Sequence, residues 1–305
     1  MQNWQKRIWQ KVRRITKRWH PPAPASGVNP IRRREANGQL RGFDGEFFVA
    51  RENLLRPIME KVVVDGGFNP SSIEYASLAG FDERVVEYPV TLSALLTLKA
   101  TKQRRLLDVG CVLNNKIISN YVCEHAAAIW FWNASLEKPV YSGDFAYVIS
   151  DLRKPFLPAE MRFDLVTCLS TLEHTGMDNI RYGGQPAEVN GKIDDPERYA
   201  IEGLQNIMRY VAPSGRLLVS VPYGPFEFLY QYGLPDRPIY YTFDRERLIK
   251  LTSALTGFDV VLSAYRVAPG RGWLPADLDE DQKMLRHADG CASAGGVAFI
   301  EAVRH

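Results

Sequence analysis

The chain after Gln103 alternates short apolar runs with amphipathic segments, and this alternation constrains the fold more than any other feature. The apolar runs are rich in β-branched and aromatic residues and are bounded by turn residues, which is typical of strands. The segments between them have helical spacing. Because parallel strands need long crossover connections, the pattern predicts an α/β fold with a mostly parallel sheet and helices on both faces. Ligands of such sheets bind outside the carboxyl ends of the strands.

The strand-like runs are RRLLDVG, AIWFWN, AYVISD, FDLVTCL, RLLVSVP, FDVVLSAYRV and GVAFIEAVRH. The segments with helical spacing between them are IISNYVCEHAA and PERYAIEGLQNIMRYVAPSG, and the second of these is expected to end at its Pro-Ser-Gly. Upstream, ARENLLRPIMEKVV, SSIEYASLAGF and VTLSALLTLKA also favour helices. We therefore divide the chain into a basic helix (1–20), a Pro-rich linker (21–42), a helical lead-in or cap (43–100) and the main α/β domain (101–305).

The net charge of +3 conceals an asymmetry between the amino-terminal arm and the rest of the chain. The first 34 residues hold ten Lys or Arg and no acid, whereas the remainder has 28 basic against 35 acidic residues. An acidic body argues against nucleic acid as a partner, and a basic arm favours an anionic one. Wound as a helix, residues 1–20 place five apolar side chains within an arc of ~80°; these are Trp4, Ile8, Val12, Ile15 and Trp19. This predicts contact with an anionic membrane surface, or alternatively with a partner helix or a second copy of the chain.

Compartment and redox state follow from what the sequence lacks. No window has the ~18 uninterrupted apolar residues of a membrane span, and no secretory signal opens the chain. We expect a cytoplasmic protein, peripheral at the inner face of the cell membrane if the arm binds there. The four cysteines show no metal-ligand spacing, which predicts reduced core thiols and no metal site. His174 and Asp178 stand four residues apart without further ligands nearby, so we interpret them as solvated polar residues.

The sharpest local motif is Leu-Leu-Asp-Val-Gly-Cys at residues 106–111. An apolar strand that ends in an acid and a glycine before a helix places a carboxylate and backbone N–H groups beside a ligand. RRLLDVGC resembles motif I of class I S-adenosylmethionine-dependent methyltransferases. YVISDLRKPFLP, FDLVTCLSTLEH and LQNIMRYVAPSGRLLVSVP resemble the later segments of that family in the same order. The preceding Val86-Glu87-Tyr88-Pro89 resembles a lead-in found in family members encoded near cell-surface polysaccharide genes.

This resemblance implies a Rossmann-like, seven-stranded sheet with an antiparallel last hairpin, and S-adenosylmethionine as cofactor. It implies contacts of Asp108, Gly110 and the adjacent Cys111 with the methionine part of the cofactor. It assigns Asp151 to the adenine amino group and Leu152 to the side of the ring. The second strand of the family normally ends in an acid that binds the ribose hydroxyls; here Asn133 stands there, with Glu137 four residues on.

Motif I departs from the family pattern directly after Cys111. Further glycine is expected, but Val112-Leu113-Asn114-Asn115 follows. Asn tolerates left-handed backbone, so Asn114 or Asn115 is predicted to make the turn. The other outcomes are a turn of different shape, weak cofactor binding, or binding that has been lost. The last of these favours a catalytically silent methyltransferase-like scaffold in a membrane-associated assembly complex.

Glu173 and His174 follow the fourth strand, where an acceptor would lie. His174 is predicted to be a general base for a hydroxyl nucleophile, or else a structural residue that pins the loop, and Glu173 a pocket-lining acid. Tyr223-Gly224-Pro225 is expected to face the same pocket. The polar insertion from Thr175 to Arg198, with Arg181 and Tyr182, is predicted to cover the substrate.

The sequence therefore predicts methyl transfer to an oxygen or nitrogen of a small or glycan-like acceptor. A sugar hydroxyl in surface polysaccharide synthesis is preferred, and the silent scaffold is the alternative. Nucleic-acid methylation is disfavoured because Thr171-Leu172-Glu173-His174 stands where an Asn/Asp-Pro-Pro-aromatic motif would be needed.

Overall fold

The computed structural model describes residues 45–70, 81–98, 104–134, 137–141, 143–155, 157–177, 195–231, 234–268, 272–278 and 295–305. The predicted basic helix and linker lie outside these residues. So do SSIEYASLAGF for all but its last residue and most of the polar insertion, including Arg181 and Tyr182. Among the described residues, no helix has the length and apolar character needed to cross a membrane.

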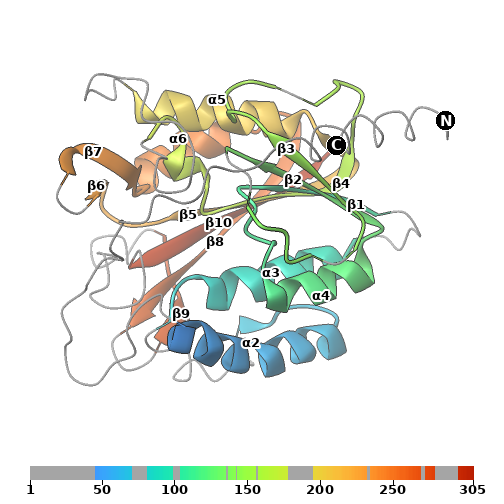
Figure 1. Cartoon of the computed structure of the whole chain (residues 1–305). Helices are drawn as coiled ribbons and strands as arrows, with labels where there is room; N and C mark the ends of the chain where they lie inside the picture. The colour runs from blue at the N-terminus through green and yellow to red at the C-terminus, as the bar shows by residue number, and fades with distance from the viewer. Residues whose placement is uncertain are drawn as a thin grey trace.

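A central eight-stranded sheet runs in the order β3-β2-β1-β4-β5-β10-β8-β9 (Figure 1). Strands β1 to β5 pair in parallel with one another, whereas β10 is antiparallel to both β5 and β8. The bounds are β1 Arg105–Val109, β2 Ala128–Asn133, β3 Phe145–Ile149, β4 Phe163–Leu169, β5 Val211–Pro222, β8 Phe258–Ala268, β9 Gly272–Pro275 and β10 Gly296–Arg304. All seven predicted strands are thus present, with the antiparallel strand inserted next to β5.

The expectation of seven strands was wrong by one, because β9 adds an edge strand. Its four residues pair antiparallel with β8, and its Trp273 is fully buried and donates from Nε1 to the carbonyl oxygen of Phe81 at 2.9 Å. A run this short has no periodicity to read, and the burial of one tryptophan holds it in place. A separate hairpin, β6 (Phe228–Gln231) with β7 (Leu234–Tyr241), was also not predicted.

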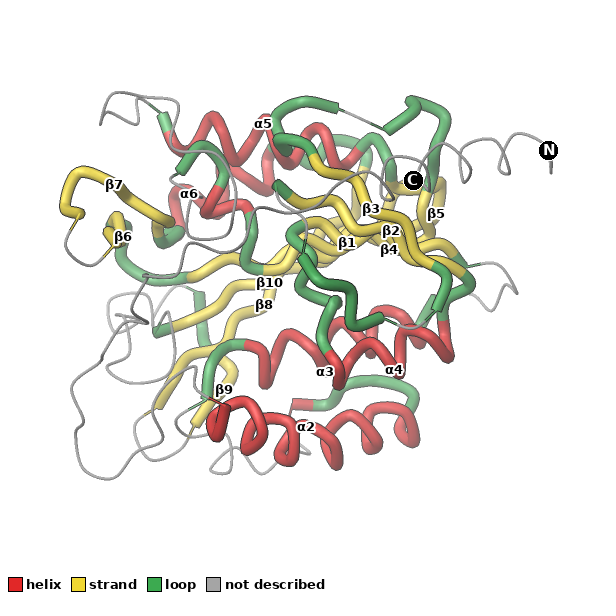
Figure 2. The backbone as a smooth tube through the Cα atoms, in the orientation of Figure 1, coloured by secondary structure: helices red, strands yellow, loops and turns green. Residues whose placement is uncertain are grey.

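Helices cover both faces of the sheet, as the alternation predicted (Figures 1 and 2). On one face lie α5 (Pro196–Met208) and α6 (Arg245–Ser253), and on the other α3 (Arg84–Leu96) and α4 (Lys116–His125). A further helix, α2 (Gly45–Asp65), packs on the outer side of α3 and α4. Each face has its own apolar core, and α2 and α3 contribute to the second core together with β1, β2 and α4.

The helix α5 ends earlier than the sequence indicated. It begins at Pro196, directly after its N-cap Asp195, whose carboxylate accepts from the N–H of Arg198 at 2.9 Å, and it ends at Met208. Pro213-Ser214-Gly215 lies inside β5, where Ser214 has φ +58° and the ladder to β4 shifts register. The turn residues therefore make an irregularity in a strand and do not end the helix.

Candidate functional site

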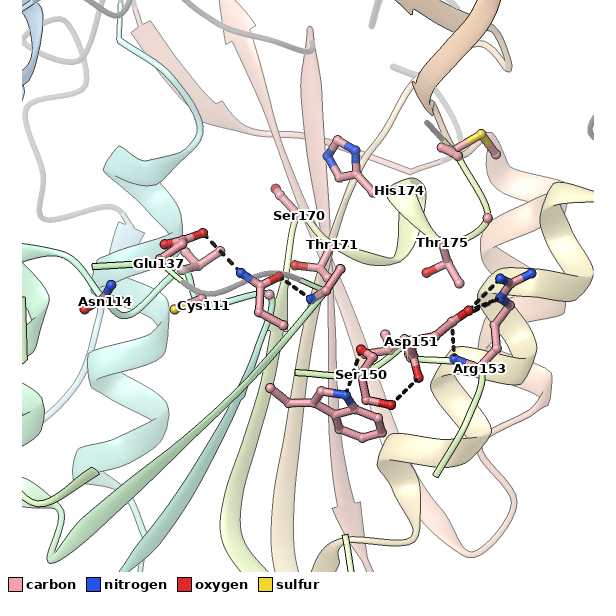
Figure 3. Close-up of a pocket in the computed structure, with 18 of the residues that line it drawn as sticks. Cys111, Asn114, Glu137, Ser150, Asp151, Arg153, Ser170, Thr171, His174 and Thr175 are labelled. Carbon is pink, nitrogen blue, oxygen red and sulfur yellow. Dashed lines mark hydrogen bonds and ion pairs between the residues drawn. The ribbon is translucent and has the colours of Figure 1, made fainter. Parts of the chain in front are cut away.

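A cavity of about 620 Å³ opens at the carboxyl ends of β1, β2, β3 and β4. Its wall is formed by the segments that follow these strands and by residues of α3. This is the position where open α/β sheets bind ligands, and the volume is within the usual range for small-molecule sites. The strand ends bring together residues that are far apart in the sequence (Figure 3).

The loop after β1 turns at Gly110 and Cys111, not at the asparagines. Gly110 has φ +94°, and a Cβ at this position would lie 1.9 Å from Oγ1 of Thr171. Cys111 follows with φ +62° and contacts the hydroxyl of Tyr147 through its sulfur. Both residues line the cavity. The prediction that Asn114 or Asn115 makes the left-handed turn is wrong, because the two residues directly after Val109 already reverse the chain.

The two asparagines have other tasks. Asn115 is the N-cap of α4 and accepts from the N–H of Ile117 at 3.0 Å. Asn114 bridges to the segment after β2: its side chain donates to the Lys138 carbonyl oxygen at 3.0 Å and accepts from the Val140 N–H at 2.7 Å. The departure from glycine therefore leaves a well-bonded loop of a different shape.

Asp108 does not line the cavity. Its carboxylate is fully buried and accepts from the Leu113 N–H and the Thr167 hydroxyl, both at 2.8 Å. Burial raises its pKa to about 7 against the opposing effect of these hydrogen bonds. Asp108 thus holds the loop after β1 through Leu113 and joins it to β4 through Thr167. Its position outside the cavity lining does not support the expectation that it contacts the cofactor directly.

Asn133 and Glu137 lie together at the end of β2. The Asn133 amide nitrogen donates to Glu137 Oε1 at 3.1 Å, and its oxygen accepts from the Ala134 N–H at 2.8 Å (Figure 3). Both side chains line the cavity. The sequence did not decide which of the two would bind the ribose hydroxyls, and in the structure they form one polar group.

Asp151 follows β3 and lines the cavity with Leu152. Arg153 donates to its carboxylate, with Nη2 2.6 Å from Oδ2 and Nε 3.1 Å from both oxygens (Figure 3). Burial alone would raise the pKa of Asp151, but the hydrogen bonds and charge of Arg153 lower it below the ordinary value. Asp151 is therefore an ionised acceptor, and Leu152 offers an apolar surface next to it.

His174 and Glu173 lie on a single 3₁₀ turn, Leu172–His174, but point into different surroundings. His174 lines the cavity, and its Nδ1 lies 2.6 Å from the carbonyl oxygen of Ile239 on β7. Because a carbonyl oxygen only accepts, Nδ1 carries the proton and Nε2 is the basic nitrogen. Glu173 is buried outside the cavity lining, and burial raises its pKa to about 8. The prediction that Glu173 lines the pocket is wrong, as is that for Tyr223, whose buried hydroxyl donates to the Leu278 carbonyl oxygen.

Sequence reasoning missed two side chains of α3 that line the cavity, Arg84 and Tyr88. It also passed over Ser170 and Thr171 at the end of β4. Tyr88 belongs to the Val-Glu-Tyr-Pro motif, and this motif was the signal in the sequence that could have indicated a role for Tyr88 in the site. Arg84 lies outside any motif, and only the packing of α3 against the sheet brings it to the site.

The order of the principal strands identifies the fold. Without the β6–β7 hairpin and the edge strand β9, the sheet order by sequence is 3-2-1-4-5-7-6, with the seventh strand antiparallel. The chain has the fold of class I S-adenosylmethionine-dependent methyltransferases. No family model and no curated protein sequence matches it.

Solved structures with a distant likeness to this chain include three methyltransferases. One is the N-methyltransferase NodS from Bradyrhizobium japonicum with S-adenosyl-L-homocysteine (10% identity, 81% of this chain, 98% of that chain, TM-score 0.42). Another is the 1,6-didemethyltoxoflavin N1-methyltransferase from Burkholderia thailandensis (16% identity, 88% of this chain, 93% of that chain, TM-score 0.42). The third is CalS10, an amino pentose methyltransferase from Micromonospora echinaspora (12% identity, 81% of this chain, 96% of that chain, TM-score 0.39). The strand order, not these likenesses, carries the fold assignment.

Proposed function

We propose that the chain is an S-adenosylmethionine-dependent methyltransferase that acts on a small or glycan-like acceptor. The observation that carries this proposal is the cavity at the ends of β1 to β4, because it gathers the polar groups a nucleoside with an amino acid tail requires. The bound cofactor supplies a methyl group on a sulfonium centre. The protein's task is to hold this group in line with the acceptor atom.

The residues present fit this cofactor. The left-handed turn brings Gly110 and Cys111 to the cavity wall, where Thr171 leaves no room for a side chain at residue 110. The Asn133–Glu137 pair provides oxygen atoms for ribose hydroxyls. Asp151 accepts from an adenine amino group, and Leu152 packs beside the ring. In this arrangement Asp108 positions the loop and does not touch the cofactor.

His174 is proposed as the general base when the acceptor atom is a hydroxyl. The Ile239 carbonyl oxygen fixes the Nδ1–H tautomer and also stabilises the imidazolium that forms when Nε2 takes the proton. We expect His174→Ala to lower turnover by roughly 10²–10⁴-fold with little change in cofactor affinity. Equal losses of turnover and affinity would instead indicate a structural histidine.

Calorimetry with S-adenosylhomocysteine tests the central claim. The wild type should bind, and Asp151→Ala should bind about one to two decades more weakly, because a charge-assisted hydrogen bond is lost. Asp164→Ala, at an acid outside the cavity lining, is the control. If the wild type shows neither heat nor a thermal shift at millimolar ligand, the enzyme proposal fails. The silent scaffold, which the altered motif I favours, would then take its place.

For the amino-terminal arm we propose an anionic membrane surface as the partner. Its ten basic residues without an acid support this, as does the apolar stripe with two tryptophans.

A further inference from the structure

The cavity continues beyond the residues proposed for the cofactor and reaches α3. Among the residues that the structure describes, five charged ones line it: Arg84, Glu137, Asp151, Arg153 and Lys154. The last four follow β2 or β3 and belong to the nucleoside end. Arg84 begins α3 and lines the same cavity as Tyr88, Ser170 and His174. Glu87 accepts from both Arg84 and Ser170, which places these two side chains near one another. A cation of α3 therefore lines the cavity that also contains the proposed base.

Glu87 holds this cation in place. It is fully buried one turn further along α3 and does not line the cavity. One of its oxygens accepts from Arg84 Nη1, and the other accepts from the hydroxyls of Ser170, at 2.7 Å, and Ser220. The carboxylate is thus satisfied by three donors from α3, β4 and β5. A long cationic side chain anchored in this way loses little conformational entropy on binding a ligand.

Arg84 keeps donors for a ligand after it has bonded to Glu87. A guanidinium has five N–H groups, and the bond to Glu87 engages a single terminal nitrogen. The Arg84 side chain is 19% exposed, so the guanidinium is not sealed into the protein. Of the other acids around it, Glu83 lies 4.0 Å from Nη1 and Asp82 pairs with Arg51. Glu173 is mostly protonated at neutral pH because burial raises its pKa to about 8.

We propose that Arg84 binds an oxyanion of the methyl acceptor, either a carboxylate or a phosphate. This inference rests on the proposed function and narrows it: the acceptor is a small molecule that carries both an anionic group and the atom to be methylated. A guanidinium fork matches both oxyanions and can bond them through two N–H groups at once. Glu87 is the positioning residue that directs the fork.

The test uses the full chain saturated with S-adenosylhomocysteine, at constant ionic strength. Inorganic phosphate and acetate are titrated separately and followed by NMR, with glycerol as the neutral probe. We expect at least one of the anions to bind and Arg84→Met to weaken that binding by about ten-fold or more. Arg56→Met, which removes an exposed cation of α2, is the matched control and should leave it unchanged.

Removal of Arg84 alone leaves the buried Glu87 without its cation and endangers folding. The double variant Arg84→Met/Glu87→Gln avoids this, because neither charge remains unpaired. It should retain affinity for S-adenosylhomocysteine and lose the anion. Tighter binding of phosphate than of acetate would indicate a phosphorylated acceptor, and the reverse order a carboxylate.

The proposed function and the role of Arg84 can be overturned separately. If S-adenosylhomocysteine does not bind the wild type, both the proposed function and this inference fall. If it binds but neither anion does, or if anion binding survives in the Arg84 variants, only the inference is overturned. Equal binding of glycerol and the anions would overturn it as well, since a neutral acceptor would then suffice.

Discussion

At the scale of single residues, close approach around Gly110 governs the shape of the site. The left-handed backbone at Gly110 and Cys111 is what allows the loop after β1 to pass Thr171, whose hydroxyl bonds back to the Leu169 carbonyl oxygen at 2.7 Å. Two separate effects therefore exclude a side chain at residue 110: the positive φ and the contact with Thr171. They can be separated by experiment.

Gly110→Ala should destabilise the protein by more than about 2 kcal/mol and abolish binding of S-adenosylhomocysteine. Gly257→Ala is the control for backbone strain alone, because Gly257 has φ +80° but nothing within 4 Å of an added Cβ; it should cost about 1–2 kcal/mol. Thr171→Ala should partly rescue Gly110→Ala in denaturant unfolding. Equal costs at the two glycines would contradict the assigned clash.

The buried carboxyl of Glu173 is expected to make the free energy of unfolding depend on pH. Its pKa in the folded protein, about 8, lies above the ordinary 4.5, so the folded state binds the proton more tightly. Its stabilising contribution is fully present below pH 4.5 and is lost as the pH rises towards and through 8.

The difference in unfolding free energy between wild type and Glu173→Gln should therefore fall with rising pH across this window. The expected change is on the order of a few kcal/mol. Denaturant unfolding at several pH values measures it, with Glu60→Gln at an exposed position of α2 as control. A flat difference would show that Glu173 is ionised throughout.

At the scale of elements, the loop between β1 and α4 connects two asparagines to two different structures. Asn115 belongs to α4 as its N-cap, whereas Asn114 joins the loop to the segment that carries Glu137. Replacing Asn115 should therefore affect mainly the stability of the protein, and replacing Asn114 mainly the binding of the cofactor.

Asn115→Ala should lower the free energy of unfolding by about 1 kcal/mol, the usual cost of a lost cap. Asn114→Ala should weaken binding of S-adenosylhomocysteine and change stability less, because its bonds are exposed. Urea unfolding and calorimetry on both variants test this, and Asn115→Asp, which keeps a capping oxygen, should retain stability. A common effect of the two alanine variants would contradict the division of tasks.

At the scale of the whole molecule, the charge asymmetry distinguishes the basic amino-terminal arm, for which we propose a membrane surface, from the mildly acidic remainder that forms the cavity. Sedimentation with liposomes of anionic lipid should pellet the full chain, and binding should fade with salt because about 1 kcal/mol per basic residue is electrostatic. Removal of residues 1–20 should abolish it, while neutral liposomes serve as control. If the intact chain does not bind anionic liposomes and the truncation changes its oligomeric state, the apolar residues of 1–20 contact a partner helix or a second copy of the chain instead.

The sequence by itself predicted seven of the eight strands of the central sheet, the helices α2 to α5 (though not all of their bounds) and the edge of the sheet at which the site lies. Strand and helix periodicity is local, and carboxyl ends of parallel strands must meet at one edge. Asn133, Asp151 and His174 therefore gather in the cavity as predicted. The direction in which each side chain points was decided only by tertiary packing. Helix α3 brings Arg84 to the cavity from a region without a motif, whereas Asp108 and Glu173 turn into the protein. Contacts with residues that are distant in the sequence set these directions, and such contacts cannot be predicted from the spacing of residues along the chain.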